Sequence, residues 1–274
     1  MTVRDAVRAG TSRLGAAGSE TARLDAELLL AHTLRAGRID LYTEFERPLS
    51  TAEQAAFDAL LVRRERLEPV AYILGEWGFR RLTLAVDGRA LIPRPETEIV
   101  VDRCLALLDG RTGADVLDVG TGAGAIALAI ADEHPDAHVT AVDDSGDALE
   151  LARENARRTG LAVSFRRQDA TIDFPPGPWD LVVSNPPYID PDDLPTLMPD
   201  VRDWEPHTAL IGPGTTEAVA RGAAATLRPG GAVVLEVGAG QAPAVAELLD
   251  DLGFDAVRVT ADLAGHDRVV EGRR

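Results

Sequence analysis

The stretch Asp118-Val119-Gly120-Thr121-Gly122-Ala123-Gly124 lies between a short apolar run and a helical pattern. Glycine lets the backbone turn sharply and approach a ligand closely, and the helix that follows points its N-terminal amides at the turn. The stretch therefore predicts a strand, a ligand-binding turn and a helix. Its spacing also fits a loose G-x-G-x-x-A dinucleotide pattern through Ala125. A tight turn without a ligand is a further alternative that this stretch leaves open.

The chain after residue 113 alternates between strand patterns and helical patterns. Strands are expected over residues 115–119, 138–143, 162–167, 180–184, 232–237 and 256–260, with a last one near 268–272. Helices are expected over residues 125–133, 147–158, 216–227 and 242–252. Apolar strands that alternate with amphipathic helices indicate a parallel sheet covered on both faces. We therefore predict an α/β fold with a doubly wound, mostly parallel, seven-stranded sheet.

Residues 1–69 carry helical patterns. Apolar positions recur at helical spacing, first at Val3, Val7, Gly10 and Leu14 and then at Leu24, Leu28, Ala31 and Leu34. Ser50 and Glu53 have the spacing of a capping box that opens a third helix, and Pro69 marks the expected end of that helix. We predict a small N-terminal helical bundle over residues 1–69.

Residues 70–95 contain short apolar runs separated by turn residues. The runs that suggest strands are Tyr72-Ile73-Leu74, Phe79 and Leu82-Thr83-Leu84, and the turn signals are Gly75, Gly78 and Asp87-Gly88. We predict a β-hairpin linker over residues 70–95. The main α/β domain is then expected to cover residues 96–274.

Composition and charge exclude several classes of protein. The chain has 274 residues with 28 Lys+Arg against 45 Asp+Glu, which gives a net charge of −17. Such a charge repels phosphate backbones, so we expect no direct nucleic-acid partner. The single cysteine excludes an intramolecular disulfide, and the five histidines show no metal-ligand spacing. No apolar run suits a membrane span or a signal peptide. We expect a cytoplasmic monomer without a metal.

Asp143 ends the second expected strand of the sheet. In open parallel sheets, ligands bind at the carboxyl ends of strands, at the point where the strand order reverses. A carboxylate there can accept both hydroxyls of a ribose, so Asp143 indicates a cofactor that contains adenosine. Alternating strand geometry should direct only Asp143 into the cleft and leave Asp144 in solvent. The loop and Asp143 together do not distinguish NAD from S-adenosylmethionine.

Asn185-Pro186-Pro187-Tyr188 follows the strand expected at 180–184 and separates these two cofactors. The prolines keep the residues before them extended and donate no N–H, so the segment is stiff. The Asn185 Oδ1 and the Pro186 carbonyl can accept both hydrogens of a planar NH2 group, and the Tyr188 ring can stack on a flat substrate. Two such acceptors favour a tetrahedral nitrogen that can attack a sulfonium methyl. The segment therefore favours methyl transfer to nitrogen over a purely structural turn.

These motifs, in this order, make the chain resemble the class I S-adenosylmethionine-dependent methyltransferases that act on NH2 groups. Further segments narrow the resemblance to the peptide chain release factor N5-glutamine methyltransferases. These segments are Pro69–Gly75, Ile92–Glu98, Val183–Ile189, and Glu205-Pro206 followed by Ala209-Leu210. The similarity runs from the N-terminal helices to the tail between Gly265 and Arg268.

The resemblance implies a class I methyltransferase fold and methylation of the glutamine amide in the Gly-Gly-Gln motif of translation release factors. S-adenosylmethionine would be the cofactor and S-adenosylhomocysteine the product, and the N-terminal helices would dock the protein substrate. The implied cofactor contacts are Gly120, Thr121, Gly122, Ala123, Gly124, Asp143, Asp169, Ala170 and Asn185. The implied substrate contacts are Asn185, Pro186, Pro187 and Tyr188, with Asn185 and Pro186 as the catalytic pair.

Other proteins share parts of this pattern. A glutamine methyltransferase for a ribosomal protein would have the same layout and differ only in its docking surface. An adenine-N6 DNA methyltransferase also uses an Asn-Pro-Pro-Tyr site, but it would need a target-recognition region and a basic groove that this sequence lacks. A non-catalytic protein that binds S-adenosylmethionine is the remaining alternative, and the intact Asn185-Pro186-Pro187 segment argues against it.

Overall fold

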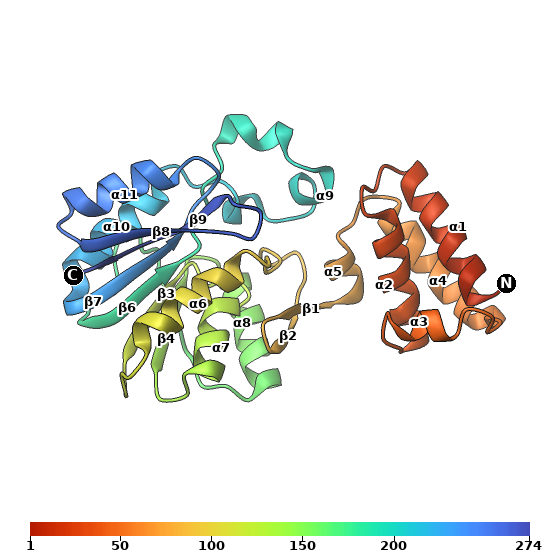
Figure 1. Ribbon diagram of the computed structural model, residues 1–274, viewed down its shortest axis with the longest axis horizontal. Coiled ribbons are helices and arrows are strands. Elements are labelled where there is room, and N and C mark those ends of the chain that lie inside the picture. The colour runs from red at the N-terminus through yellow and green to blue at the C-terminus, as the bar shows by residue number, and fades with distance from the viewer. The chain divides into compact units, whose positions relative to one another are not determined.

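The computed structural model describes the whole chain, from Met1 to Arg274. The chain divides into two compact units, whose elements are labelled in Figure 1. The first unit is Met1–Glu76 with Leu197–Trp204, and the second is Trp77–Thr196 with Glu205–Arg274. The first unit thus extends past residue 69, where we expected the bundle to end, and includes a segment from late in the chain. None of the helices combines the length and apolarity that a membrane span requires.

The first unit is helical, with α1 (Val3–Ala16), α2 (Ala22–Leu34), α3 (Asp40–Thr43), α4 (Thr51–Arg64), α5 (Val70–Leu74) and α9 (Pro199–Arg202). The predicted capping box at the start of α4 is confirmed, because the side chains of Ser50 and Glu53 each accept the other's backbone N–H. Gly10 allows α1 to pack closely, since a Cβ there would lie 3.0 Å from the Phe57 ring and 3.1 Å from Ala26.

The apolar positions named for α2 agree only in part with its buried face, because Ala31 is buried whereas Leu28 and Leu34 are half-buried. Leu24 is 39% exposed, whereas Asp25, Leu29 and Leu30 are buried. The Asp25 carboxylate accepts a hydrogen bond from Arg64 Nε at 2.7 Å, and Arg64 is itself buried. In a hydrophobic pattern, an aspartate is taken as a surface residue. The buried Arg64 and the hydroxyl groups of Ser19 and Thr21, which also donate to Asp25, make the observed face possible.

Residues 70–74 form helix α5, so the strand predicted at Tyr72-Ile73-Leu74 is wrong. Pro69 precedes the helix, where an N–H is not needed, and Gly75 ends it in the left-handed conformation with φ of 76°. The hairpin consists of β1 (Glu76–Phe79) and β2 (Leu82–Ala85). A run of three apolar residues does not separate a strand from a helix, and here the flanking proline and glycine favoured the helix.

The second unit contains a seven-stranded sheet in the order β5-β4-β3-β6-β7-β9-β8, which confirms the predicted sheet. Its strands are β3 (Asp115–Val119), β4 (His138–Asp143), β5 (Ser164–Arg167), β6 (Trp179–Ser184), β7 (Leu227–Glu236), β8 (Asp255–Ala261) and β9 (Asp267–Arg273). Only β9 runs antiparallel to its neighbours. The strand order reverses between β3 and β6, and this is where open α/β sheets bind ligands.

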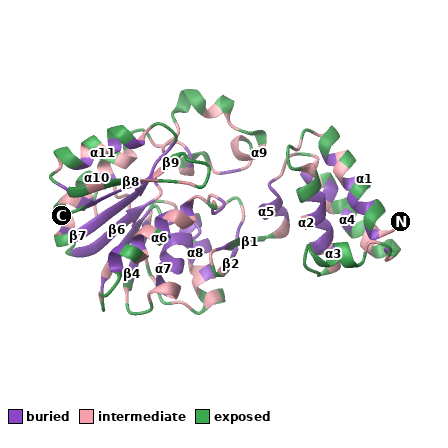
Figure 2. Ribbon diagram, viewed as in Figure 1, coloured by how far each residue is buried: buried purple, intermediate pink, exposed green.

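Helices cover both faces of this sheet, as Figure 1 shows. One face carries α6 (Thr97–Leu108), α7 (Ala125–Glu133) and α8 (Gly146–Thr159), and the other carries α10 (Thr215–Thr226) and α11 (Ala242–Asp251). Val116 belongs to the core beside α6 and α7, whereas its neighbour Leu117 belongs to the core beside α10 and α11. Figure 2 shows the central strands buried between helices whose outer surfaces are exposed. The segment between β6 and α10 adds two short 3-10 helices, η1 (Pro191–Thr196) and η2 (His207–Ala209).

Asn155 on α8 joins the hairpin to the glycine-rich loop after β3. Its Oδ1 accepts from the Ala85 N–H at 2.7 Å, and its Nδ2 donates to the carbonyls of Ala85 and Ala123, each at 3.0 Å. The side chain is fully buried, so its removal leaves these backbone groups without this partner.

Asn155→Ala should lower the free energy of unfolding of the second unit by about 3 kcal/mol, because it removes three buried hydrogen bonds. Urea unfolding followed by circular dichroism measures the change. Thr159→Ala on the same helix is the matched control, since the Thr159 hydroxyl donates only to carbonyls of its own helix. Its expected effect is below about 0.5 kcal/mol. Equal losses for the two variants would contradict the linking role of Asn155.

Candidate active site

The carboxyl ends of β3, β4 and β6 lie side by side because the strands pair in register. Val119, the last residue of β3, pairs with Val142 on one side and with Ser184 on the other. The residues that come next in the three strands are Gly120, Asp143 and Asn185. Three motifs that are distant in sequence therefore meet where the strand order reverses.

Alternate residues of the loop after β3 have left-handed backbone conformations. Gly120, Gly122 and Gly124 have φ angles of 72°, 55° and 85°, which residues with a side chain rarely adopt. A Cβ on Gly120 would meet no atom within 4 Å, so this part of the backbone borders open space. A Cβ on Gly124 would instead lie 3.2 Å from Ala152 and Leu128. The third glycine thus allows α7 to pack closely against α8.

Asp143 is partly buried, and both of its carboxylate oxygens accept hydrogen bonds from the backbone. Oδ2 accepts from the Gly122 N–H and Oδ1 from the Ser145 N–H, each at 2.9 Å. Burial raises the pKa of Asp143 above its usual value, and the two N–H groups oppose that rise. A carboxylate oxygen can accept more than one hydrogen bond, so these two backbone contacts do not exhaust its acceptor capacity. Asp143 can therefore hold the glycine loop and still accept two hydroxyl groups of a ligand.

Asp118 supports the same loop from within the protein. The carboxyl is fully buried, its Oδ2 accepts from the Thr121 hydroxyl at 2.6 Å, and its Oδ1 has no hydrogen-bond partner. Burial raises the pKa of Asp118 to about 7. The sequence analysis gave this residue no role, because nothing in the motif shows that the aspartate points inward.

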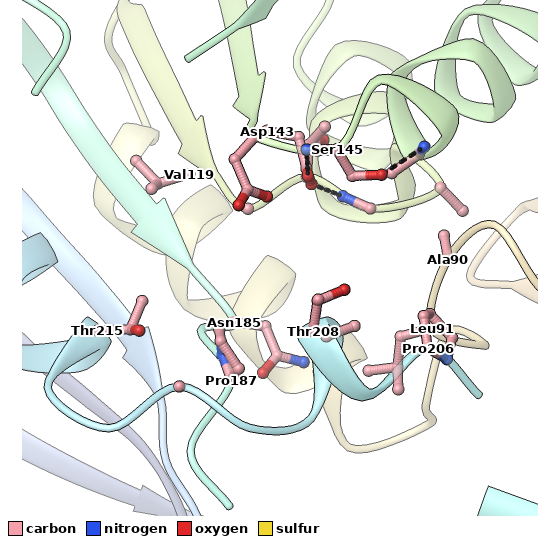
Figure 3. Close-up of a pocket in the computed structure, with 18 of the residues that line it drawn as sticks. Ala90, Leu91, Val119, Asp143, Ser145, Asn185, Pro187, Pro206, Thr208 and Thr215 are labelled. Atoms are coloured by element: carbon pink, nitrogen blue, oxygen red, sulfur yellow. Dashed lines mark hydrogen bonds between the residues drawn. The ribbon is translucent and has the colours of Figure 1, made fainter. Parts of the chain in front are cut away.

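A cavity of about 520 Å³ opens at this edge of the sheet, a volume typical of small-molecule and cofactor sites. Figure 3 shows Asp143 on one side of it and Asn185 and Pro187 on the other. The predicted site residues that line it are Gly120, Thr121, Gly122, Ala123, Asp143, Asp169, Ala170, Asn185 and Pro187. Those that do not line it are Gly124, Pro186 and Tyr188. Asp144 is exposed, as expected, and also borders the cavity.

Asn185 and the prolines after it are held by their neighbours. The Asn185 Nδ2 donates to Thr97 Oγ1 at 3.3 Å. Pro186 is buried, and Pro187 lies so near Gly212 that a Cβ on that glycine would be 2.4 Å from the proline ring. Gly212, to which we assigned no role from the sequence, is therefore required by this close approach. Packing adds to the stiffness that the two prolines already confer.

Tyr188 lies beside the loop after β7. Its carbonyl accepts from Gln241 Nε2 at 2.9 Å, and a Cβ on Gly238 would lie 2.9 Å from its ring. Burial raises the pKa of Tyr188 to about 12, and the nearby Glu236 contributes to the rise. Stacking of this ring on a substrate stays a prediction.

Asp169 and Ala170 follow β5 and line the cavity together with Thr171. The Asp169 Oδ1 accepts from the Thr171 hydroxyl at 2.6 Å and from its N–H at 2.9 Å. These two hydrogen bonds hold the pKa of Asp169 below its usual value. Asp169 is thus a fixed, ionised acceptor, and Ala170 adds a small apolar surface. Their contact with a cofactor stays a prediction.

The segment Gly88–Arg94 also lines the cavity, although we predicted no role for it. Glu205 holds this segment in place, because its buried carboxylate accepts from the Ile92 N–H at 3.1 Å and forms an ion pair with Arg94. Pro206 borders the cavity directly after it. Ile92, Arg94 and Glu205 all belong to the segments that carry the family resemblance. The family resemblance was therefore the sequence signal that could have placed these residues near the site, since no chemical motif marks them.

The lining as a whole suits a cationic nucleoside cofactor. Asp143 offers lone pairs for two hydroxyl groups, and the glycine loop leaves room for a ligand against the backbone. The carboxylates of Asp143, Asp144 and Asp169 make this side of the cavity negative, which favours a positively charged group. Across the cavity, Asn185 contributes an amide whose nitrogen is already hydrogen-bonded.

Two family models match the chain: residues 5–75 match the PrmC N-terminal domain, and residues 101–197 match the methyltransferase small domain. A solved structure of similar fold is a 16S rRNA methyltransferase from T. thermophilus, determined in complex with AdoMet and guanosine. The TM-score is 0.53 with 21% identity, and the match covers 73% of this chain and 49% of that chain. The second unit therefore has the class I methyltransferase fold, as predicted.

Curated relatives are similar over nearly the full length. The release factor glutamine methyltransferase of Cereibacter sphaeroides is 43% identical over 282 residues, which cover 100% of this chain and 99% of the relative. The protein of the same name from Xylella fastidiosa is 44% identical over 265 residues, which cover 95% of this chain and 96% of the relative. These matches confirm the resemblance drawn from the sequence motifs. The chain belongs to the release factor glutamine methyltransferase family.

Proposed function

We propose that this enzyme transfers a methyl group from S-adenosylmethionine to the side-chain amide nitrogen of the glutamine in the Gly-Gly-Gln motif of translation release factors. The observation that carries the proposal is the position of Asn185, which directly follows β6 and lies across one cavity from Asp143. The names of the relatives support a release factor as the protein substrate and glutamine as the residue modified.

S-adenosylmethionine fits the glycine-loop side of the cavity. Asp143 would accept the ribose hydroxyls with the lone pairs that its two backbone hydrogen bonds leave free. The loop from Gly120 to Ala123 would border the methionine part, and Asp169 and Ala170 the adenine. The cofactor, when bound, supplies a methyl group on a positively charged sulfur, which makes that carbon electrophilic.

Asn185 and Pro186 would bind the glutamine amide. An amide nitrogen is a poor nucleophile because its lone pair is delocalised into the carbonyl. The Asn185 Oδ1 and the Pro186 carbonyl would accept its two hydrogens, favour a tetrahedral nitrogen and stabilise the positive charge that develops on its N–H groups. The proline pair keeps these acceptors in place before the substrate arrives. Pro187 and Tyr188 would complete the glutamine site.

The helical unit would dock the release factor. A family model for the PrmC N-terminal domain matches residues 5–75, which supports a part of the chain that is distinct from the methyltransferase domain. We further propose that the enzyme acts as a monomer in the cytoplasm, where its substrate works on the ribosome.

The experiment that tests this function uses purified enzyme, methyl-labelled S-adenosylmethionine and release factors, followed by mass mapping of the labelled peptide. We expect one methyl group on the glutamine of the Gly-Gly-Gln motif. A release factor with alanine in place of that glutamine is the matched control and should remain unlabelled. Label that appears on ribosomal proteins or on DNA, with none on the release factor, would overturn the proposal.

A further inference from the structure

Three side chains from distant parts of the second unit form a hydrogen-bonded chain at the cavity wall. Thr97 Oγ1, at the start of α6, donates to Glu236 Oε2 at 2.7 Å, and Glu236 ends β7. Asn185 Nδ2 donates to the same Thr97 oxygen at 3.3 Å. Thr97 is 4% exposed and Glu236 is 2% exposed. Thr97 and Asn185 line the cavity, whereas Glu236 does not and is connected to Asn185 by its hydrogen bond with Thr97.

The direction of these hydrogen bonds follows from the charge of Glu236. An ionised carboxylate accepts hydrogen bonds and donates none, so the single hydroxyl hydrogen of Thr97 must point to Glu236. The Thr97 oxygen then has only lone pairs left for Asn185, and these accept from an NH2 group. The amide nitrogen of Asn185 is thereby held at the wall of the cavity, and its oxygen is left available to a ligand.

The burial of the Glu236 carboxylate indicates a functional role for its charge. A buried carboxylate is costly, and an apolar residue of similar size would stabilise the sheet more. Glu236 has a neutral hydroxyl as its hydrogen-bond partner, at a distance of 2.7 Å, rather than an arginine in contact. A carboxyl that is buried in this way next to a cavity is a candidate for a functional residue.

We propose that Thr97 and Glu236 are positioning residues that fix the Asn185 amide with its oxygen toward the substrate NH2 group. The inference rests on the proposed function, because a substrate that donates two hydrogens requires an acceptor at this place. A reversed amide would present its own NH2 group to the substrate NH2 group, and two donors cannot bind each other. The hydrogen bonds from Glu236 through Thr97 to Asn185 therefore select one of the two amide orientations, the one that presents the oxygen to the substrate.

The orientation of the Asn185 amide should depend on pH, because it depends on the protonation of Glu236. Burial raises the pKa of Glu236 to about 7, while the Thr97 hydroxyl, Arg268 and Arg94 oppose the rise and Glu96 adds to it. Tyr188 also lies beside the carboxyl and is neutral in this range, since its own pKa is raised to about 12. Once protonated, Glu236 can donate to Thr97, whose hydroxyl is then free to donate to the Asn185 oxygen and turn the NH2 group to the cavity. Activity should therefore fall as the pH drops below about 7.

A pair of substitutions at Thr97 tests the role of the hydroxyl. Thr97→Val keeps the shape of the side chain and removes the hydroxyl, and Thr97→Ser keeps the hydroxyl and removes a methyl group. We expect Thr97→Val to lower kcat for release factor methylation by about 30-fold, while the Kd for S-adenosylmethionine changes less than about threefold. Thr97→Ser should retain at least about a third of the activity. Melting temperatures of both variants separate this effect from a loss of folded protein.

Glu236→Gln tests the charge. The glutamine side chain has nearly the same shape and does not titrate, so kcat should lose its decrease between pH 8 and pH 6, which we expect to be about tenfold in the wild type. The substrate amide does not titrate in this range, so it cannot produce that decrease itself.

The outcomes separate the two proposals. If the wild-type enzyme does not label the glutamine, the proposed function fails. If the wild type labels it but Thr97→Val is as active as Thr97→Ser, or Glu236→Gln keeps the wild-type pH profile, the positioning role is wrong and the function stands.

Discussion

Asn185→Ala is expected to lower kcat for glutamine methylation by about 10³-fold, because it removes one of the two acceptors that stabilise the developing charge on nitrogen. The Kd for S-adenosylmethionine should change less than about threefold, since Asp143 and the glycine loop on the other side of the cavity would hold the cofactor. Single-turnover rates with labelled cofactor measure the first quantity, and calorimetric titration measures the second.

The matched control for Asn185 is the residue before it, Ser184, which ends β6. The Ser184 hydroxyl donates to the carbonyl of Val119 at 2.7 Å, is buried and does not line the cavity. Ser184→Ala should therefore keep kcat within about threefold of the wild type, although it removes a hydrogen bond between β3 and β6. An Asn185→Ala enzyme that retained most of its activity would remove Asn185 from the proposed mechanism.

Asp143→Ala is expected to weaken S-adenosylmethionine binding by about 10²-fold. The substitution would remove two hydrogen bonds between a charged carboxylate and the ribose, and a net contribution of about 1.5 kcal/mol from each corresponds to about 10²-fold in affinity. It would also release the Gly122 N–H, which donates to Asp143 at 2.9 Å and helps to fix the glycine loop. Calorimetric titration of the purified variant measures the change in Kd. Its melting temperature, compared with that of the wild type, shows whether the variant remains folded.

Asp144→Ala is the control for Asp143. It removes the same charge from the next residue, which lines the same cavity but is exposed and is not hydrogen-bonded to the glycine loop. We expect its affinity to stay within about threefold of the wild type. If both substitutions weakened S-adenosylmethionine binding equally, the cavity would attract the cofactor by charge alone. The proposal that Asp143 binds the ribose would then be wrong.

The strands and the position of the cavity could be predicted because local patterns encode them. The expected strand 115–119 and helix 125–133 agree with β3 and α7 to the residue, since the apolar run and the glycine-rich turn leave few alternatives. The rule that ligands bind at the carboxyl ends of parallel strands predicts that Gly120, Asp143 and Asn185 lie together, and the register of β3 with both neighbours confirms that they meet.

The remaining features depend on contacts between distant residues. Asp25 is buried beside Arg64, with which it forms a hydrogen bond, and hydrophobic periodicity does not reveal such a pair. Thr97 and Glu236 lie 139 positions apart in the chain, so neither could be connected to Asn185 from the sequence. The short helix α5 was missed because flanking residues, rather than the apolar run itself, determine its conformation.

The most direct test of the central claim is a crystal structure of the enzyme with S-adenosylhomocysteine and a release factor. The account predicts that the glutamine side-chain nitrogen lies within about 3.2 Å of both the Asn185 Oδ1 and the Pro186 carbonyl oxygen. A glutamine nitrogen that meets neither oxygen, or that faces the NH2 group of Asn185, would contradict it.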